Sequence, residues 1–384
     1  MTTNKQTYRF VLRPLDKVFF GGEKSPFIDE DYFLRSHFLP QQTALLGFTR
    51  YWLLLKAGLL KDSSKKGWPE LIGDRSFDGS QSQTFGAIQR LTPLGVAHLD
   101  ANGQVMEDFY YCQKMGDLAL EKAPETVKYA LGDGQVFKDD FALFKAGPYV
   151  YNSKDQNKGY FQPWFWNLAD DYVKVVSEPK ASTHFFNTAP ADHSVFIKDT
   201  KPGITKNYGG ESKEDGYFKT EYYRMQRNFA YTFLVELDTT LLPENFAKPG
   251  FCRFGGDAGS VAVSIQPHEP SSAPEPNTGD CFFLLSDTLS TMDIYRHCKS
   301  ARVKVVHFRN LRTANSDTNY SRRPRMWYQG REDPQHSNSG KIMLQKGSLL
   351  IAKPGQAEQL QQCLQQPAYY KIGYNHFIRL NQLP

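Results

Sequence analysis

The sequence lacks the patterned cysteines that mark disulfide frameworks and zinc sites. Five cysteines occur in 384 residues, and no two of them form a CxxC pair. An odd, unpatterned set argues against disulfides and zinc and is typical of a reducing compartment. The five are Cys112, Cys252, Cys281, Cys298 and Cys363.

Long apolar runs and familiar catalytic motifs are also missing. No apolar run is long enough to span a bilayer, and the polar N-terminus MTTNKQTYRF does not have the pattern of a signal peptide. GxSxG, HExxH, P-loop and Rossmann fingerprints are absent from the sequence. We therefore expect a cytoplasmic protein with no membrane partner, no cofactor and no metal.

The residues that are present suit a globular chain with an RNA partner. The hydrophobic fraction of 40% supports a packed core, and 384 residues exceed the usual size of a single core. Aromatic residues make up 14% of the chain. Surplus aromatics can stack on single-stranded nucleic acid, although filling sheet cores explains many of them equally well.

Positive charge is concentrated in one tract. The net charge is +5, yet ten Lys or Arg residues and one acid, Asp317, lie between Arg296 and Arg331. The rest of the chain therefore has a net negative charge. The basic tract predicts where a negatively charged partner such as RNA binds. Arginines beside Trp327 and Tyr328 suit single-stranded RNA, while a grip on an acidic protein surface is the competing interpretation. The arginines concerned are Arg322, Arg323 and Arg325.

A glycine- and lysine-rich loop precedes an aromatic strand in the segment Lys201–Met225. Its glycines, among them Gly203 and Gly210, allow positive φ and close approach to a ligand backbone. Its lysines offer charges for phosphates, so the pattern predicts an RNA-facing loop on a sheet. A solvated hairpin without a partner remains the alternative. The RNA-binding candidates here are Lys206, Asn207, Lys213 and Lys219.

A second glycine-rich segment, FGGDAG, begins at Phe254. A two-metal palm would show GGDD with paired carboxylates, but Ala258 stands where the second Asp would be. We therefore interpret Gly255 and Gly256 as a backbone loop shaped around RNA rather than a metal site.

The order of expected elements favours an α+β fold. A strand over Tyr8–Phe20 and a helix from Pro40 to Gly58 are the opening of a ferredoxin-like βαββαβ unit, the fold of RRM domains. Alternating strands and helices from Cys281 to the C-terminus predict a second such set. We expect two ferredoxin-like (RRM-like) domains with long inserted loops and hairpins. Their ranges are 1–190, and 191–384 with a basic loop at 310–340.

Four stretches, in order along the chain, resemble a RAMP-superfamily subunit of type III-B (Cmr) CRISPR effector complexes, the one that binds the 5′ tag of crRNA. No single stretch is diagnostic, but their order is fairly specific. They are YRFVLRPLDKVFFGGEKSPF at Tyr8–Phe27, LPQQTALLGFTRYW at Leu39–Trp52, PGITKN…EDGYFKTEYYRM within Lys201–Met225, and FGGDAGSVAVSI at Phe254–Ile265.

The resemblance implies a role without catalysis. The family's subunit caps the crRNA 5′ tag and bridges the large polymerase/cyclase-like subunit to a RAMP backbone subunit. Its first helix lies near the tag, which implies that Thr43 and Arg50 face RNA. Two alternatives stay open: a metal-independent repeat endoribonuclease using His37 as general acid or base, and a protein-bridging scaffold that does not contact RNA.

Overall fold

The computed structural model of the chain divides into two compact units, which we describe separately. Unit 1 comprises 1–73, 86–109 and 188–270, and unit 2 comprises 74–85, 110–187 and 271–384. This division differs from the expected boundary at residue 190, because the segment 188–270 belongs with the N-terminal residues. The structure describes residues 4–24, 32–61, 66–73, 77, 79, 83–113, 131–132, 149–150, 172–176, 186–188, 195–206, 210, 212–256, 259–269, 279–289, 291–303, 305–308 and 341–380.

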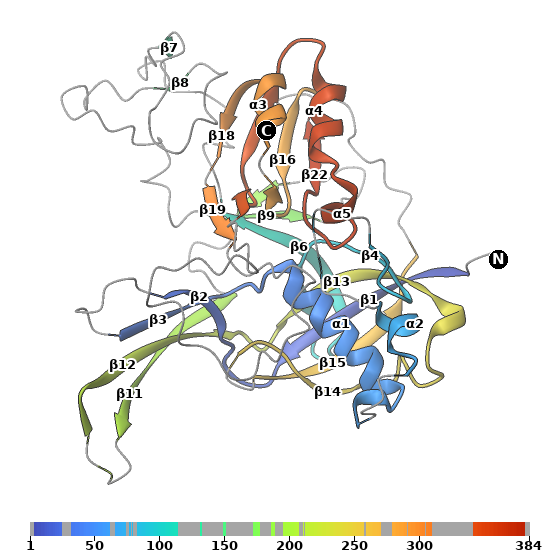
Figure 1. The fold of residues 1–384 in the computed structure, drawn as a ribbon, viewed down its shortest axis with the longest axis vertical. Helices are drawn as coiled ribbons and strands as arrows, with labels where there is room; N and C mark the ends of the chain where they lie inside the picture. The colour runs from blue at the N-terminus through green and yellow to red at the C-terminus, as the bar shows by residue number, and fades with distance from the viewer. Residues whose placement is uncertain are drawn as a thin grey trace. The chain divides into compact units, whose positions relative to one another are not determined.

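Unit 1 is built on an antiparallel sheet with β1 (Lys5–Pro14) at its centre. Pairing of Lys5 with Asp238 begins a long ladder between β1 and β13, which explains why the later segment belongs to this unit. Figure 1 shows the sheet crossed by one long helix. In spatial order its strands are β6 (Val105–Gln113), β5 (Gly95–Leu99), β13 (Phe229–Asp238), β1, β15 (Ser260–Pro267) and β14 (Gly250–Arg253), with β4 (Ile88–Leu91) also on β13.

Helix α1 (Gln42–Lys56) covers one face of this sheet and lies within the predicted Pro40–Gly58 helix. Alternation along β1 buries Phe10 and Leu12 against it, and Phe10 stacks on Phe233 with ring centroids 5.2 Å apart. On the helix, Trp52 is fully buried. Short helices follow at η1 (Leu59–Lys61) and α2 (Trp68–Ile72).

The connection from β13 to β15 runs beside α1 and contains only η5 (Thr239–Leu241) and β14. Side chains of α1 hold it in place. The indole Nε1 of Trp52 donates to the carbonyl of Phe246 at 3.1 Å, and the Lys56 ammonium donates to the carbonyl of Lys248 at 2.6 Å. This connection therefore packs through tertiary contacts, and it leads directly to the predicted glycine segment.

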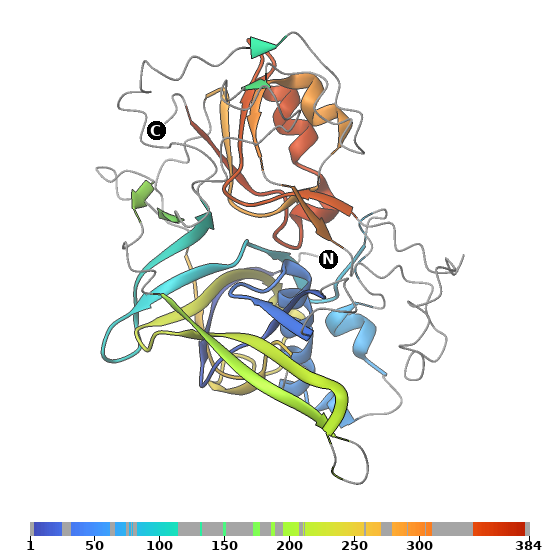
Figure 2. The same ribbon diagram turned by 90° about the vertical axis from the view of Figure 1, so that its left-hand side faces the viewer.

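A second sheet of unit 1 carries a long hairpin formed by β11 (Phe196–Lys206) and β12 (Ser212–Met225), seen in yellow-green in Figure 2. Strand β12 pairs in parallel with β3 (Tyr32–His37), which pairs with β2 (Phe20–Lys24). The hairpin corrects one expectation. Gly203 lies inside β11, and a Cβ there would fall 2.3 Å from the ring of Phe218 across the ladder, so this glycine makes room for an aromatic side chain.

Unit 2 has a four-stranded antiparallel sheet in the spatial order β18, β21, β16, β22. Along the chain, helix α3 lies between β16 and β18, and helices α4 and α5 lie between β21 and β22. Before the last strand, Pro367 begins a helical turn, and Gly373 at φ +91° follows it. The elements are β16 (Cys281–Leu284), α3 (Met292–His297), β18 (Cys298–Arg302), β21 (Leu349–Ala352), α4 (Ala357–Leu364), α5 (Pro367–Tyr370) and β22 (Phe377–Leu380).

Smaller sheets complete unit 2. One is formed by β17 (Thr288–Leu289), β20 (Lys341–Leu344) and β19 (Val305–Phe308). A short pair is made by β7 (Leu131–Gly132) with β8 (Tyr149–Val150), whereas β9 (Tyr172–Val176) and β10 (Phe186–Thr188) follow β6 at one end of the nine-stranded sheet. Within the residues that the structure describes, no helix is long and apolar enough to cross a membrane.

Both faces of the main sheet of unit 2 are buried. One face packs on the helices through Phe282, Leu360 and Leu364. The opposite face packs through Phe283 and Leu349 against Cys112. Neither face of this sheet is therefore open, because the protein's own side chains cover both.

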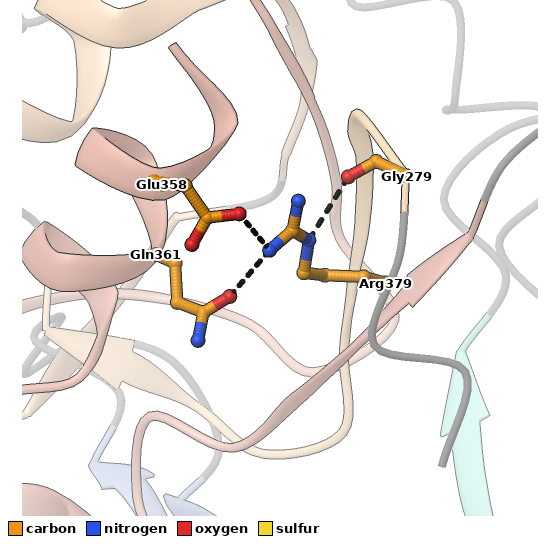
Figure 3. A network of polar contacts seen from close by, with 4 residues as sticks. All are labelled: Gly279, Glu358, Gln361 and Arg379. Atoms are coloured by element: carbon orange, nitrogen blue, oxygen red, sulfur yellow. Dashed lines mark hydrogen bonds and ion pairs between the residues drawn. The ribbon is translucent and has the colours of Figure 1, made fainter. Parts of the chain in front are cut away.

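A buried arginine fastens the last strand of unit 2 (Figure 3). The guanidinium of Arg379 points between α4 and the segment before β16. It donates to the carboxylate of Glu358 at 2.7 Å, the amide oxygen of Gln361 at 2.8 Å and the carbonyl of Gly279 at 2.9 Å. The same guanidinium lies 5.4 Å from the ring centre of Phe282.

Candidate nucleic-acid interface

The turn after β1 joins two of the predicted motifs by backbone hydrogen bonds. Val18 exchanges hydrogen bonds with Tyr223 of the hairpin, at 2.7 and 3.1 Å. One residue later, the carbonyl of Phe19 accepts from the amide of Gly256 at 2.8 Å. The hairpin strand β12 and the glycine segment, which are distant in sequence, are therefore held on either side of one short turn in unit 1.

The conformation at Gly255 requires glycine. Its φ is +86°, and a Cβ there would lie 2.8 Å from the carbonyl oxygen of Phe19 and 2.9 Å from the ring of Phe20. A Cβ on Gly256 would lie 3.0 Å from the ring of Phe19. Both glycines are exposed on their other side. These two glycines therefore allow the close approach of the protein's own turn and leave their backbone accessible.

A pocket of about 420 Å³ lies between α1, β2 and the glycine turn. Rings of Phe20 and Phe48 pack against Phe254 at 5.2 and 5.1 Å beneath it. A Cβ added to Gly47 would meet nothing within 4 Å, so the helix surface is open there. The polar and charged side chains along the pocket are His37, Gln41, Tyr51 and Arg253. An aromatic floor with a few polar groups is typical of sites for planar ligands.

Aromatic contacts continue from the pocket to the base of the hairpin. Tyr231 packs on Phe20, Phe254 and Phe196, with ring centroids 5.9, 6.2 and 6.0 Å apart. Its hydroxyl donates to the carbonyl of Phe38 at 2.6 Å, and burial raises the pKa of this phenol well above its usual value. Phe38 in turn contacts Tyr223 at 5.7 Å. One set of packed aromatic side chains therefore connects the pocket to the base of the hairpin.

Of the predicted helix residues, Thr43 and Arg50 are half-buried and do not line the pocket. The helix residues that line it are Ala44, Gly47, Phe48 and Tyr51. Tyr51 was not predicted. Its aromatic side chain, directly after Arg50 in the sequence, could have indicated a base-stacking residue. Arg253 was missed because the glycine segment was taken to begin at Phe254.

The predicted hairpin lysines are not brought to the pocket. Lys206 pairs with Ser212 at the far end of the ladder, and Lys213 follows on β12. Ser212 and Tyr223 are eleven positions apart, which is roughly 35 Å along an extended strand. Closer to the base, Lys219 is half-buried with its ammonium 5.7 Å from the ring centre of Tyr217. The lysines thus follow the hairpin outward.

Other cations at the base of the hairpin are neutralised by acids. Lys198 pairs with buried Glu221 at 2.5 Å, and Lys17 pairs with Asp199 at 3.6 Å. Arg224 lies 3.8 Å from both Asp16 and Asp199. These cations are less available to phosphates than Arg253, which has no acidic partner among the described residues. Asn207 and the arginines Arg322, Arg323 and Arg325 lie outside the described residues.

Metal chemistry has no support in the part of the chain that the structure describes, where no group of three His, Cys, Asp or Glu side chains could hold an ion. Asp257 and Ala258 lie outside the described residues.

Comparison with known proteins gives similarity to solved structures alone. No family model matches the sequence, and no curated protein matches it. The chain is similar to a chain of the type III-B Cmr-beta complex bound to cognate target RNA and AMPPnP, with 13% identity, TM-score 0.49 and coverage of 98% of this chain and 97% of that one. A Cmr-beta chain bound to cognate target RNA gives 14% identity, TM-score 0.49 and 97% coverage of both chains.

A further similarity is to a chain of the Csm3–Csm4 subcomplex of a type III-A CRISPR-Cas interference complex. It has 12% identity and TM-score 0.38, and it covers 90% of this chain and 93% of that one. With identities of 12–14% and TM-scores below 0.5, these similarities do not by themselves assign the chain to a family.

Proposed function

We propose that this chain is a non-catalytic RNA-binding subunit of a type III-B CRISPR ribonucleoprotein, and that it caps the 5′ tag of crRNA. One observation carries the proposal. The stretches whose sequences resemble the family meet in unit 1: the turn at Val18–Phe19 is hydrogen-bonded to the hairpin strand and to the glycine turn, and the first helix closes the pocket beside them.

The proposal includes two ferredoxin-like domains. In unit 2 the strands of the main sheet and the helices α3 and α4 follow the βαββαβ order, with β17, β19, β20 and α5 as additional elements. In unit 1 the strands β1, β5, β13 and β15 take the same spatial arrangement, with β1 and β13 in the middle, but no second helix lies between β13 and β15. Unit 1 is then the domain that contacts the tag.

RNA recognition follows from the chemistry of the pocket. The guanidinium of Arg253 can bind a phosphate bidentately, and the ring of Tyr51, 41% exposed, can stack on an unstacked base. Exposed backbone at Gly255 and Gly256 allows close approach of a ribose or phosphate. The hairpin lysines would then bridge to the large polymerase/cyclase-like subunit and the RAMP backbone subunit beyond the pocket.

A salt titration of binding tests the proposal. Purified protein is titrated against labelled crRNA with the 5′ tag intact or scrambled, and the complexes are run on gels that also reveal cleavage. We expect tighter binding to the intact tag, no cleavage, and a log–log salt slope of about 0.7 per phosphate neutralised. Binding that ignores the tag would refute the capping role, and salt-independent binding or none would favour a protein-bridging scaffold.

His37 supports a second candidate, a metal-independent endoribonuclease. His37 is exposed and lines the pocket, where an imidazole can act as general acid or base on an RNA 2′-hydroxyl. In that case the gels show a cut in repeat RNA that persists in EDTA and disappears in His37→Ala. His98, which is stacked on Phe229 5.0 Å away, provides the control variant His98→Ala.

A further inference from the structure

The open face of the sheet in unit 1 carries a shallow trough at its β14 end. Strand β15 alternates, with Val261 and Val263 buried on the α1 side and the small residues Ser260 and Ala262 facing outward. Strand β14 is the outermost strand of the sheet. The backbones of β14 and β1 lie two strand spacings apart, about 10 Å, with only small side chains between them.

Large side chains form the two walls. In one cross-strand row Arg13, Ala262 and Phe251 are register partners, so the cation and the aromatic ring flank a methyl group. In the next row Leu15, Ser260 and Arg253 are neighbours, since the amide of Leu15 donates to the carbonyl of Ser260 at 3.0 Å. The walls are accessible, with Phe251 71% and Leu15 54% exposed and both arginines exposed.

The two arginines of the walls are available to bind an anion. Among the described residues neither Arg13 nor Arg253 makes an ion pair, in contrast to Arg9, which lies 3.2 Å from Asp108 on the same sheet face. The two rows of the trough contain two guanidinium groups without an ion pair among the described residues, and they contain no acid. A phenylalanine ring projects beside them. This combination is complementary to a polyanion that carries planar groups. Arg253 also lines the pocket, so it is the one residue of these two rows that the trough and the pocket share.

We infer that this trough, which we call the β15 trough, binds a single-stranded RNA segment adjoining the nucleotide in the pocket. The inference rests on the proposed function. Phe251 stacks on a base, and Arg13 and Arg253 contact the phosphates on either side of it. Stacking of this kind is tolerant of sequence, so the β15 trough adds affinity without reading the tag.

Conservative variants of exposed residues test the trough. We compare Phe251→Leu, which keeps an apolar side chain but removes the ring, with Phe251→Tyr, which keeps it. We expect Phe251→Leu to weaken crRNA binding roughly fivefold to a hundredfold and Phe251→Tyr to bind as the parent protein does. The ratio of affinities for intact and scrambled tags stays unchanged in both variants.

A charge variant measures the arginines independently. Arg13→Gln with Arg253→Gln lowers the log–log salt slope by about 1.4, which corresponds to two phosphates. The matched control is Lys5→Gln with Arg90→Gln, because both of these cations already face Glu236 at 3.3 and 3.8 Å, and the slope stays as in the parent protein. Cross-linking with 4-thiouridine-substituted crRNA places the attached nucleotide on the peptide that contains Phe251.

The outcomes separate this inference from the proposed function. If the parent protein binds the tag and neither Phe251→Leu nor Arg13→Gln alone changes affinity or slope, the β15 trough is overturned and the capping role stands. Unchanged RNA binding with loss of a partner subunit in Phe251→Leu overturns it in favour of a protein interface. A changed ratio between intact and scrambled tags overturns the sequence-independent contact proposed for this trough.

Discussion

In unit 2 the segment between β21 and β22 forms α4, whereas in unit 1 the segment between β13 and β15 forms only the three-residue η5 and the edge strand β14. Helix α4 satisfies its own backbone and buries Leu360 and Leu364 against the sheet. The equivalent segment of unit 1 depends on α1, through the hydrogen bonds that Trp52 and Lys56 donate to its carbonyls. In unit 2, helix α4 covers the hydrophobic core. In unit 1 the corresponding segment forms no such helix among the described residues, and the pocket and the glycine turn lie there instead.

The two units also differ in how their arginine side chains are used. The buried guanidinium in unit 2, Arg379, has three acceptors and a structural role. In unit 1 the exposed guanidinium groups of Arg13 and Arg253 have no acidic partner in the described part of the chain. We infer that one strand arrangement serves packing in unit 2 and ligand contact in unit 1.

The largest expected effects come from removing the side chain that fixes each helix. Trp52→Ala should destabilise the protein by about 3–5 kcal/mol and Leu360→Ala by about 2–5 kcal/mol, because both side chains are fully buried. Hydrogen exchange read by mass spectrometry should show faster exchange in β14 and β15 for Trp52→Ala and in β16 and β22 for Leu360→Ala. Equal loosening of both sets in either variant would contradict the comparison.

The glycine turn should be the next most sensitive position. Gly255→Ala should cost roughly 2–4 kcal/mol, since strain at positive φ adds to overlap with the Phe19 carbonyl. Gly355 in unit 2, at φ +72° with nothing within 4 Å of an added Cβ, is the matched control, and Gly355→Ala should cost about 1–2 kcal/mol. Urea unfolding measures both. Equal costs would mean that the approach of Phe19 is not constrained.

Breaking the Arg379 network should have an intermediate effect. Arg379→Met should destabilise unit 2 by about 1.5–3 kcal/mol, because three charge-assisted or carbonyl hydrogen bonds are lost from a side chain only 8% exposed. Glu358→Gln should cost less than about 1 kcal/mol, since that side chain is 70% exposed. Tag binding should be unchanged in both variants, and a loss of binding in Arg379→Met at full folding would assign unit 2 a part in the site.

The smallest effect at neutral pH is a pH dependence set by buried thiols, which develops only in alkaline solution. Burial raises the pKa of Cys112 and Cys298 in unit 2 to about 12, and that of Cys252 in unit 1 to about 11. Thiols protonated in the fold but ionised in the unfolded chain make stability fall as pH rises above about 9, by about 1.4 kcal/mol per pH unit for each thiol. Unfolding from pH 8 to 10 measures it.

The thiol-to-alanine variants sharpen that measurement. Cys112→Ala combined with Cys298→Ala should flatten the alkaline decline more than Cys252→Ala does, because two thiols are removed instead of one. An unchanged decline in the double variant would assign the pH dependence to other groups, such as Tyr8, whose pKa burial also raises.

The sequence predicted unit 2 better than unit 1, because the elements of the main sheet in unit 2 follow one another along the chain. In unit 1 the partners of β1 lie far along the chain at Phe229–Asp238 and Ser260–Pro267. Local periodicity carries no signal for such pairing, and the boundary expected at residue 190 therefore cuts through this unit.

At the site, the glycine pair was predictable from its composition, but the face of the helix was not. A helix turns about 100° per residue, so choosing Thr43 and Arg50 instead of Ala44 and Tyr51 selects a neighbouring face. The β15 trough depends on the register among β1, β15 and β14, and register requires knowledge of which strands pair.

The pairing of Lys5 with Asp238 also sets an order of events during synthesis. The first strand leaves the ribosome long before either of its partners exists, so its backbone bonds to water and its apolar face stays exposed while most of the chain is translated. The main sheet of unit 2, drawn from the last hundred or so residues, forms from near neighbours. Because distant pairing is slow and exposes apolar surface meanwhile, chaperone dependence should be concentrated on the N-terminal strand.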